Sequence, residues 1–168
     1  TLKIDAVVNA ANSRMEGCWQ PCHACIDNCI HTYSGVQLRL FCHDMMMKQG
    51  HEEPAGQAKI TPGYNLPAKY VLHTVGPVID HPLTQHDCDL LASCYRACLA
   101  SAVSNNCCSI AFCCISTGVF RFPQEKAAQI AVHTVKAFLG KDSAIKRVVF
   151  NVFSTKDEQI YRRLLGAI

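Results

Sequence analysis

The chain has 168 residues, of which 49% are hydrophobic and 17% charged, and its net charge is +3 at neutral pH. This is the size of a single globular domain that can bury a core without disulfide bonds. The longest apolar run, at residues 110–115, is far too short to cross a membrane, and the basic residues are scattered along the chain. The composition therefore indicates neither a membrane-spanning protein nor a nucleic-acid-binding surface.

The pattern of apolar residues predicts strands that alternate with helices. We expect strands at residues 4–10, 58–61, 70–75, 109–115 and 146–153, and helices at residues 27–34, 36–48, 87–103, 124–139 and 157–165. Asp27 is a good candidate for the N-cap of the first helix. Strands in alternation with helices are typical of an α/β fold, in which a mostly parallel sheet is covered on both faces. The chain shows no repeat, linker or low-complexity segment, so we expect residues 1–168 to form one domain.

Twelve cysteines are many for a chain of this length. The adjacent pairs Cys107–Cys108 and Cys113–Cys114 lie in or beside a predicted core strand, where neighbouring side chains point to opposite faces. We interpret them as small apolar residues that stay reduced, and not as a disulfide scaffold. Reduced thiols in this number predict a cytoplasmic protein.

The segment between Asn9 and His31 concentrates polar and metal-binding side chains. It contains three asparagines, four cysteines, two histidines and one aspartate, and it directly follows the first predicted strand. Open α/β sheets bind their ligands at the ends of such strands. The sequence therefore predicts the functional site in this segment.

The cysteines of this segment allow two kinds of metal site. Cys18, Cys22, Cys25 and Cys29 are spaced by four, three and four residues, which would place all four on one face of a helix. A structural zinc bound by four thiolates is therefore one alternative. Pro21 argues against a continuous helix through the segment, because proline lacks the backbone donor and clashes with the preceding turn.

Two other groups of residues at strand ends are suited to ligand binding. Asn9 and Asn12 follow the first strand, and from spacing alone such asparagines are more often turn residues than ligand contacts. The loop at 116–120 lies between a buried strand and a helix N-terminus. Gly118 allows a ligand to approach the backbone closely, and successive N–H groups can bind phosphate oxygens.

Five motifs, in this order, resemble those of a macrodomain, the ADP-ribose-binding module. They are V-V-N-A-A-N-S at 7–13, I-D-N-C-I-H at 26–31, G-Q-A-K-I-T-P-G-Y-N-L-P at 56–67, Y-V-L-H-T-V-G-P at 70–77 and I-S-T-G-V-F-R-F-P at 115–123. An insertion at 17–25, G-C-W-Q-P-C-H-A-C, resembles the zinc-dependent branch of hydrolytic macrodomains. The resemblance implies a three-layer α/β/α fold with a mixed, mostly parallel sheet. It also implies a hydrolase that removes mono-ADP-ribose from modified, acidic protein side chains.

The resemblance assigns roles to residues near the scissile bond. It implies that Cys18, His23 and Cys25 bind a zinc ion and leave its fourth position open. Asp27 would then orient the attacking water, and Asn12 would contact the adjacent ribose. With these three ligands, Cys29 would pack inside the helix and Cys22 would have no role.

The resemblance also assigns contacts along the rest of ADP-ribose. Asn9 would hold the loop, and Phe153 would pack against adenine unless it is a plain core residue. The diphosphate would bind Ser116, Thr117, Gly118, Val119 and Phe120. The family has a strand and an adenine-contacting aspartate upstream of this region, so we expect residues 1–168 to lack the N-terminal edge strand.

Two other functions remain open at this stage. The same pocket could read ADP-ribose without cleaving it, or deacetylate O-acetyl-ADP-ribose. In each case the expected partners are ADP-ribose and, for the hydrolase, a mono-ADP-ribosylated protein. We expect the chain to be a monomer.

Overall fold

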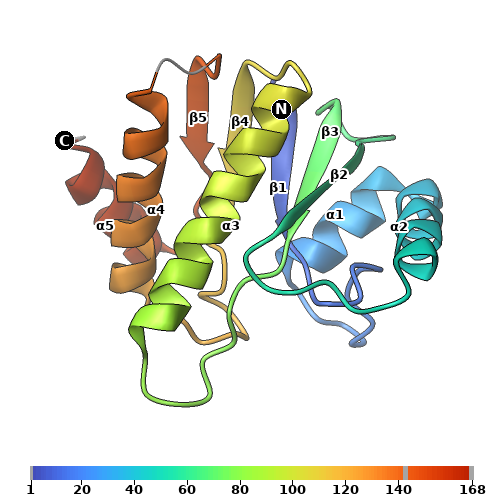
Figure 1. The fold of residues 1–168 in the computed structure, drawn as a ribbon, viewed down its shortest axis with the longest axis horizontal. Helices are drawn as coiled ribbons and strands as arrows, with labels where there is room; N and C mark the ends of the chain where they lie inside the picture. Colours follow the sequence, from blue (N-terminus) through green and yellow to red (C-terminus); the bar gives the residue numbers. More distant parts are fainter. Residues whose placement is uncertain (1, 142–143, 167–168) are drawn as a thin grey trace.

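The computed structural model describes residues 2–141 and 144–166 (Figure 1). Its helices and strands follow in the order β1 (Ala6–Ala10), α1 (Ile26–Ser34), α2 (Val36–Gln49), β2 (Ala58–Pro62), β3 (Tyr70–Thr74), α3 (Gln85–Ser104), β4 (Ser109–Phe112), α4 (Gln124–Leu139), β5 (Arg147–Phe150) and α5 (Thr155–Leu165). Each predicted element is present, but the two predicted strands at 109–115 and 146–153 are each only four residues long. Among the described residues, no helix is long and apolar enough to cross a membrane.

The strands form one sheet in the order β2-β3-β1-β4-β5, with β1 at its centre. All neighbours pair in parallel except β2 and β3, which are antiparallel. Helices α3, α4 and α5 pack on one face, and α1 and α2 lie on the other. The predicted three-layer α/β/α fold with a mixed, mostly parallel sheet is therefore confirmed.

Alternate residues of the strands supply the two faces, as a period of two requires. In β1, Ala6 and Val8 join the core beneath α3 and α4, whereas Val7 packs on the side of α1 and α2. A row of aromatic contacts extends the first core toward α5. The ring centroids of Tyr95 and Phe112 are 5.0 Å apart, and those of Phe150 and Tyr161 are 4.9 Å apart.

All twelve cysteine thiols are free. Cys113 and Cys114 pack against the core, and burial raises the pKa of their thiols to about 11 and about 12, so that both stay protonated. Cys107 is buried as predicted for an apolar residue. Cys108 has a free thiol but is exposed, so the interpretation of Cys108 as a packed apolar residue is wrong.

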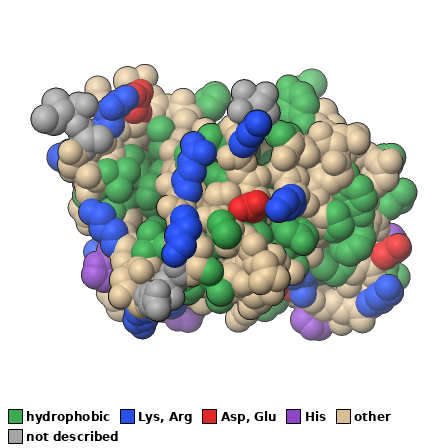
Figure 2. Space-filling view, turned by 90° about the horizontal axis from the view of Figure 1, so that it is seen from above, with side chains coloured by type: hydrophobic (Ala, Val, Ile, Leu, Met, Phe, Trp, Pro, Cys, Tyr) green, Lys and Arg blue, Asp and Glu red, His purple; other side chains and the backbone are tan. Residues whose placement is uncertain are grey.

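The surface seen from above carries lysine and arginine side chains separated by hydrophobic and uncharged ones (Figure 2). This matches the scattered distribution of basic residues in the sequence. The sheet has β2 and β5 at its edges, each hydrogen-bonded to one other described strand. The expectation of a further edge strand outside residues 1–168 stays a prediction.

The loop after β4 is held against the segment that follows β3. Ile79 N–H donates to the Phe120 carbonyl at 2.8 Å and joins the two segments, while Phe122 N–H donates to the Ser116 carbonyl at 2.9 Å within the loop. Gly76 lies beside this loop. A Cβ built on Gly76 would overlap Ser116 Oγ and lie 2.8 Å from Cγ2 of Ile115. The close approach of the two segments therefore requires glycine at position 76.

This contact predicts the effect of adding one methyl group. Gly76→Ala should lower the free energy of unfolding by about 1–3 kcal/mol, because overpacking forces the loop at 116 to move. Gly118→Ala is the matched control, since a Cβ at Gly118 has no heavy atom within 4 Å among the described residues. Urea unfolding of both variants tests this. Equal stability of the two would contradict the close packing at Gly76.

Candidate functional site

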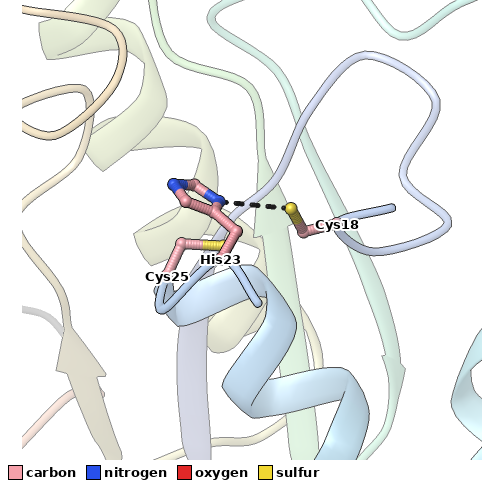
Figure 3. A group of neighbouring side chains, drawn as sticks. All are labelled: Cys18, His23 and Cys25. Atoms are coloured by element: carbon pink, nitrogen blue, oxygen red, sulfur yellow. Dashed lines mark hydrogen bonds between the residues drawn. The ribbon is translucent and has the colours of Figure 1, made fainter. Parts of the chain in front are cut away.

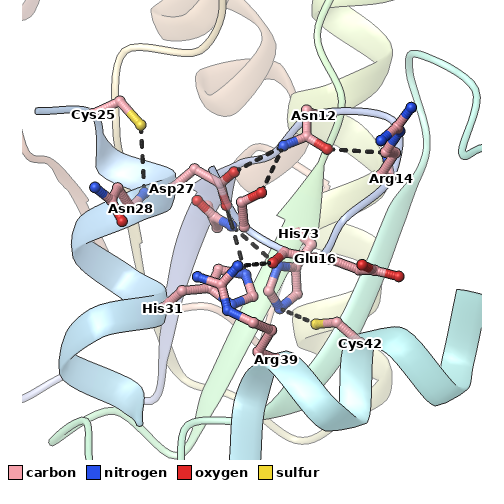
Figure 4. Close-up of polar contacts among 12 residues, drawn as sticks. Asn12, Arg14, Glu16, Cys25, Asp27, Asn28, His31, Arg39, Cys42 and His73 are labelled. Atoms are coloured by element: carbon pink, nitrogen blue, oxygen red, sulfur yellow. Dashed lines mark hydrogen bonds and ion pairs between the residues drawn. The ribbon is translucent and has the colours of Figure 1, made fainter. Parts of the chain in front are cut away.

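Asp27 is a buried carboxylate held by two asparagine side chains at the carboxyl end of β1 (Figure 4). Asn9 Nδ2 donates to Asp27 Oδ1 at 2.8 Å, and Asn12 Nδ2 donates to Asp27 Oδ2 at 3.2 Å. Asn9 belongs to β1, Asn12 to the loop that follows, and Asp27 to the first turn of α1. The structure thus brings together three of the residues that the sequence singled out.

The N-cap of α1 is Cys25, and the prediction that Asp27 is the N-cap is wrong. The Cys25 sulfur accepts a hydrogen bond from the Asn28 backbone N–H at 3.4 Å. Asp27 comes two residues later, and its side chain turns inward to the asparagine amides. The helix therefore has a sulfur cap, and the carboxylate remains available at the site.

The surroundings of Asp27 favour a proton-accepting role. Burial raises the pKa of this carboxyl above its usual range, and the Asn9 amide, the charge of Arg39 and the Asn12 amide act in the opposite direction. The carboxylate is thus desolvated but still held in a fixed orientation. A carboxylate with these properties can accept a proton from a water placed beside it.

Cys18, His23 and Cys25 form a cluster of possible metal ligands (Figure 3). Their donor atoms lie within 4.8 Å of one another, and Cys18 Sγ is 3.3 Å from His23 Nδ1. A tetrahedral zinc with bonds of about 2.0–2.3 Å holds neighbouring donors roughly 3.3–3.8 Å apart. All three side chains are half-buried. The donor set and its spacing therefore fit a zinc ion with three protein ligands.

The other two cysteines of the segment lie outside this cluster. Cys22 and Cys29 are both exposed, and among the described residues neither joins a group of metal-binding atoms. The interpretation of Cys29 as a packed helix residue is wrong, because its position on α1 faces solvent. The four-cysteine arrangement is thus not assembled in this structure.

The predicted diphosphate loop leads from β4 toward the N-terminus of α4. Ser116 is buried and has a left-handed backbone conformation, with φ of 64°. Thr117 Oγ1 donates to the Cys114 carbonyl at 3.1 Å. Gly118 and Val119 are exposed, and Phe120 is half-buried. These residues share one short loop, as the sequence predicted, and their role toward a ligand stays a prediction.

Phe153 lies three residues beyond the end of β5, and its side chain is fully exposed. The alternative that it is a core residue is therefore wrong. Its ring is free to stack on a planar group, which leaves the adenine contact as a prediction.

Sequence reasoning missed His73, a buried residue of β3. Its Nδ1 lies 3.1 Å from Asn9 Nδ2, and its Nε2 lies 3.0 Å from Thr61 Oγ1. The pattern Y-V-L-H-T gives one signal, since a histidine inside an apolar strand needs polar partners. His31 and Cys42 lie next to it and complete a buried group of possible donor atoms. His73 thereby links Asn9 of the central strand β1 to Thr61 of the edge strand β2.

The comparisons with known proteins agree with this geometry. The model of the Macro domain family matches residues 8–131. The chain belongs to this family. It is 65% identical over 166 residues to a protein named protein-ADP-ribose hydrolase from Treponema medium, and 57% identical over 163 residues to one of that name from Staphylococcus aureus strain MSSA476. These matches cover 99% and 96% of this macrodomain but only 64% and 61% of the two relatives.

Solved macrodomain structures are similar along nearly the whole chain. The Oceanobacillus iheyensis macrodomain with ADP has a TM-score of 0.89 and 34% identity, over 98% of this chain and 84% of that one. The Trypanosoma brucei macrodomain in complex with ADP-ribose has a TM-score of 0.83 and 36% identity, over 98% of this chain and 64% of that one. The fold around the site is thus one that carries adenosine diphosphate ligands in other proteins.

The buried histidines predict a pH dependence of stability. Burial lowers the pKa of His73 to about 3, and neighbouring His31 acts in the same direction. The folded state therefore keeps His73 neutral, whereas the unfolded chain binds a proton below about pH 6.5. The free energy of unfolding should fall as the pH drops below 6.5, by up to about 1.4 kcal/mol per pH unit for this group.

Urea unfolding at several pH values between 7 and 4.5 measures this slope. In His73→Gln, the free energy of unfolding should depend less steeply on pH, by about the contribution of one bound proton. At pH 7 this variant is less stable than the wild type. His51→Gln, at an exposed position, is the control and should keep the original slope. An unchanged slope in the His73 variant would contradict the account of a buried neutral imidazole.

Proposed function

We propose that this macrodomain is a zinc-dependent hydrolase that removes mono-ADP-ribose from modified protein side chains, acidic ones in particular. One observation carries the proposal. Asp27, held by Asn9 and Asn12, lies two residues from Cys25, which caps the same helix and belongs to the cluster with Cys18 and His23. A buried carboxylate and a cluster of two thiols and one imidazole thus lie near one strand end, which supports the proposal. The names of the relatives support this reading.

In this proposal, Asn12 holds a ribose hydroxyl and Asp27 orients a water molecule. The water oxygen bonds to the anomeric carbon of the ribose as the bond from that carbon to the side-chain carboxylate breaks. Asp27 accepts the proton that the water loses. The products are ADP-ribose and the free acidic side chain. The two asparagine amides keep Asp27 oriented, so that little rearrangement is needed.

Cys18, His23 and Cys25 would hold the zinc ion. Bound there, zinc would supply Lewis acidity and a fixed anchor for a substrate oxygen. These two thiolates and one imidazole would leave room for that oxygen, and three is the number of protein ligands found in catalytic zinc sites.

The rest of ADP-ribose would extend along the loop after β4. Backbone N–H groups of residues 116–120 would bind the diphosphate, helped by the nearby N-terminus of α4. Phe153 would stack on adenine with its exposed ring. We further propose that the protein acts as a monomer in the cytoplasm, where its twelve free thiols stay reduced.

The test is turnover of a protein that carries ADP-ribose on glutamate, before and after chelation of zinc. We expect release of ADP-ribose that chelation abolishes and added zinc restores. Binding of ADP-ribose without release would indicate a reader module. Faster turnover of O-acetyl-ADP-ribose than of the modified protein would indicate a deacetylase.

Loss of the Asp27 carboxylate should abolish most of the activity. Asp27→Ala is expected to lower the turnover rate by about 10²–10⁴-fold, because the water loses its proton acceptor. Calorimetry should show that ADP-ribose still binds. Asp44→Ala, which removes an exposed carboxylate of α2, is the matched control and should keep full activity. Unchanged turnover in the Asp27 variant would assign the proton transfer to another group.

Metal analysis of single variants distinguishes the two possible zinc sites. We expect about one zinc per chain, with Cys18→Ser and His23→Ala each lowering the zinc content strongly. Cys29→Ser, at an exposed cysteine outside the cluster, should keep zinc. Zinc loss in the Cys29 variant together with normal zinc in the His23 variant would instead indicate a four-cysteine site.

A further inference from the structure

Of the three proposed zinc ligands, His23 and Cys25 are fixed by hydrogen bonds at the start of α1, whereas Cys18 lies in a loop. Cys25 caps α1, and His23 is tied to it, since the Cys25 N–H donates to the His23 carbonyl at 3.1 Å. The Asn28 side chain also donates to the His23 carbonyl, at 2.9 Å. Cys18 comes from the loop between β1 and α1, five residues before His23. Whether Cys18 stays within reach of the other ligands therefore depends on what holds residues 16–19.

Arg39 reaches from α2 to Glu16 of this loop (Figure 4), and it also contacts Trp19, so that its two contacts lie before and after Cys18 in the sequence. Its Nη1 donates to the Glu16 carbonyl at 2.7 Å. Its guanidinium carbon lies 4.4 Å from the centre of the Trp19 ring. Arg39 thus binds the main chain of Glu16, two residues before Cys18, and stacks on the side chain of Trp19, one residue after it.

The main chain at Gly17 packs closely against the side chains of His31 and Arg39. Its φ is +84°, and a Cβ there would lie 2.8 Å from His31 Cγ and 3.1 Å from Arg39 Nη2. On its other side, the Gly17 carbonyl accepts a hydrogen bond from Asn12 Nδ2 at 3.1 Å. The main chain next to Cys18 therefore runs between the arginine of α2 and the asparagine that also holds Asp27.

Two further features point to a positioning role for Arg39. Its guanidinium forms no close ion pair with a carboxylate of the described residues. Its direct contacts are with the loop, and its charge acts on Asp27 from a longer distance. The Trp19 side chain is 65% exposed, so burial does not explain why its ring lies where it does. Stacking on a planar cation is an attraction that acts at such an exposed site.

We infer that Arg39 and Trp19 form a clamp that holds Cys18 at binding distance from His23 and Cys25. Arg39 is a positioning residue, because its contacts with Glu16 and Trp19 act on Cys18 through the loop. The inference rests on the proposed zinc site for its consequence. A loosened clamp lowers zinc affinity by releasing Cys18, whereas loss of the Arg39 charge also acts on Asp27.

Zinc affinity, measured by competition with a chelator, tests the inference. Arg39→Met should weaken zinc binding by about 10–100-fold, as loss of a residue that orients a metal ligand typically does. Arg39→Lys, which keeps the cation and one donor, should fall between the wild type and Arg39→Met. Trp19→Phe should stay near the wild type and Trp19→Ala should resemble Arg39→Met. Arg96→Met, at an exposed arginine of α3, is the control and should not change zinc affinity.

The fluorescence of Trp19 gives a second readout that needs neither metal nor activity, since Trp19 is the only tryptophan of the chain. Arg39→Met should increase quenching of this fluorescence by acrylamide, because the Trp19 ring loses the cation on which it stacks. Unchanged quenching and unchanged zinc affinity would overturn the inference. If the wild type binds no zinc, the proposed function fails, and quenching still decides whether the clamp exists. If Arg39→Met does not fold, Arg39→Lys and Trp19→Ala decide the matter.

Discussion

The burial of the Asp27 carboxylate at the end of β1 is the constraint on which the site depends. A desolvated carboxylate is costly unless donors satisfy both oxygens, and here the donors are the amides of Asn9 and Asn12. The first comes from the central strand and the second from the loop behind it. Because Asp27 is in the first turn of α1, these two bonds fix the start of that helix against the sheet. The sulfur cap of Cys25 and the approach of the loop at Gly17 follow from this placement.

The same asparagine connects the site to the interior of the sheet. Asn9 lies beside His73 of β3, and His73 lies beside Thr61 of β2, so a line of buried polar contacts crosses three neighbouring strands. Such a line is stable only if every member has a partner, which makes the position of each dependent on the next. Asp27 is therefore supported from the edge of the sheet as well as from its own helix. A rigid support of this kind is what a proton acceptor requires.

Local patterns were sufficient to predict the fold and part of the site. The pattern of apolar residues located every strand, and the polar segment after β1 indicated the place of the site. The roles predicted for Asn12 and Asp27 came from the resemblance to macrodomains. From spacing alone, Asn9 is more often an exposed turn residue than a ligand contact. In the structure it is wholly buried, because its partners Asp27 and His73 come from distant parts of the chain. The N-cap of α1 was predicted wrongly, because the Cys25 sulfur accepts the hydrogen bond that was expected for the Asp27 carboxylate. Arg39 could not be recognised, because which face of α2 meets the loop is decided by tertiary packing.

We propose one zinc ion, bound by two sulfurs and one nitrogen, with an open position beside Asp27. X-ray absorption of the zinc-loaded protein tests it most directly, with and without ADP-ribose. The account predicts two sulfurs at about 2.3 Å, one nitrogen at about 2.0–2.1 Å, and one further light atom whose signal changes when ADP-ribose is added. Four sulfurs around the metal, with no change on addition of ADP-ribose, would contradict the account.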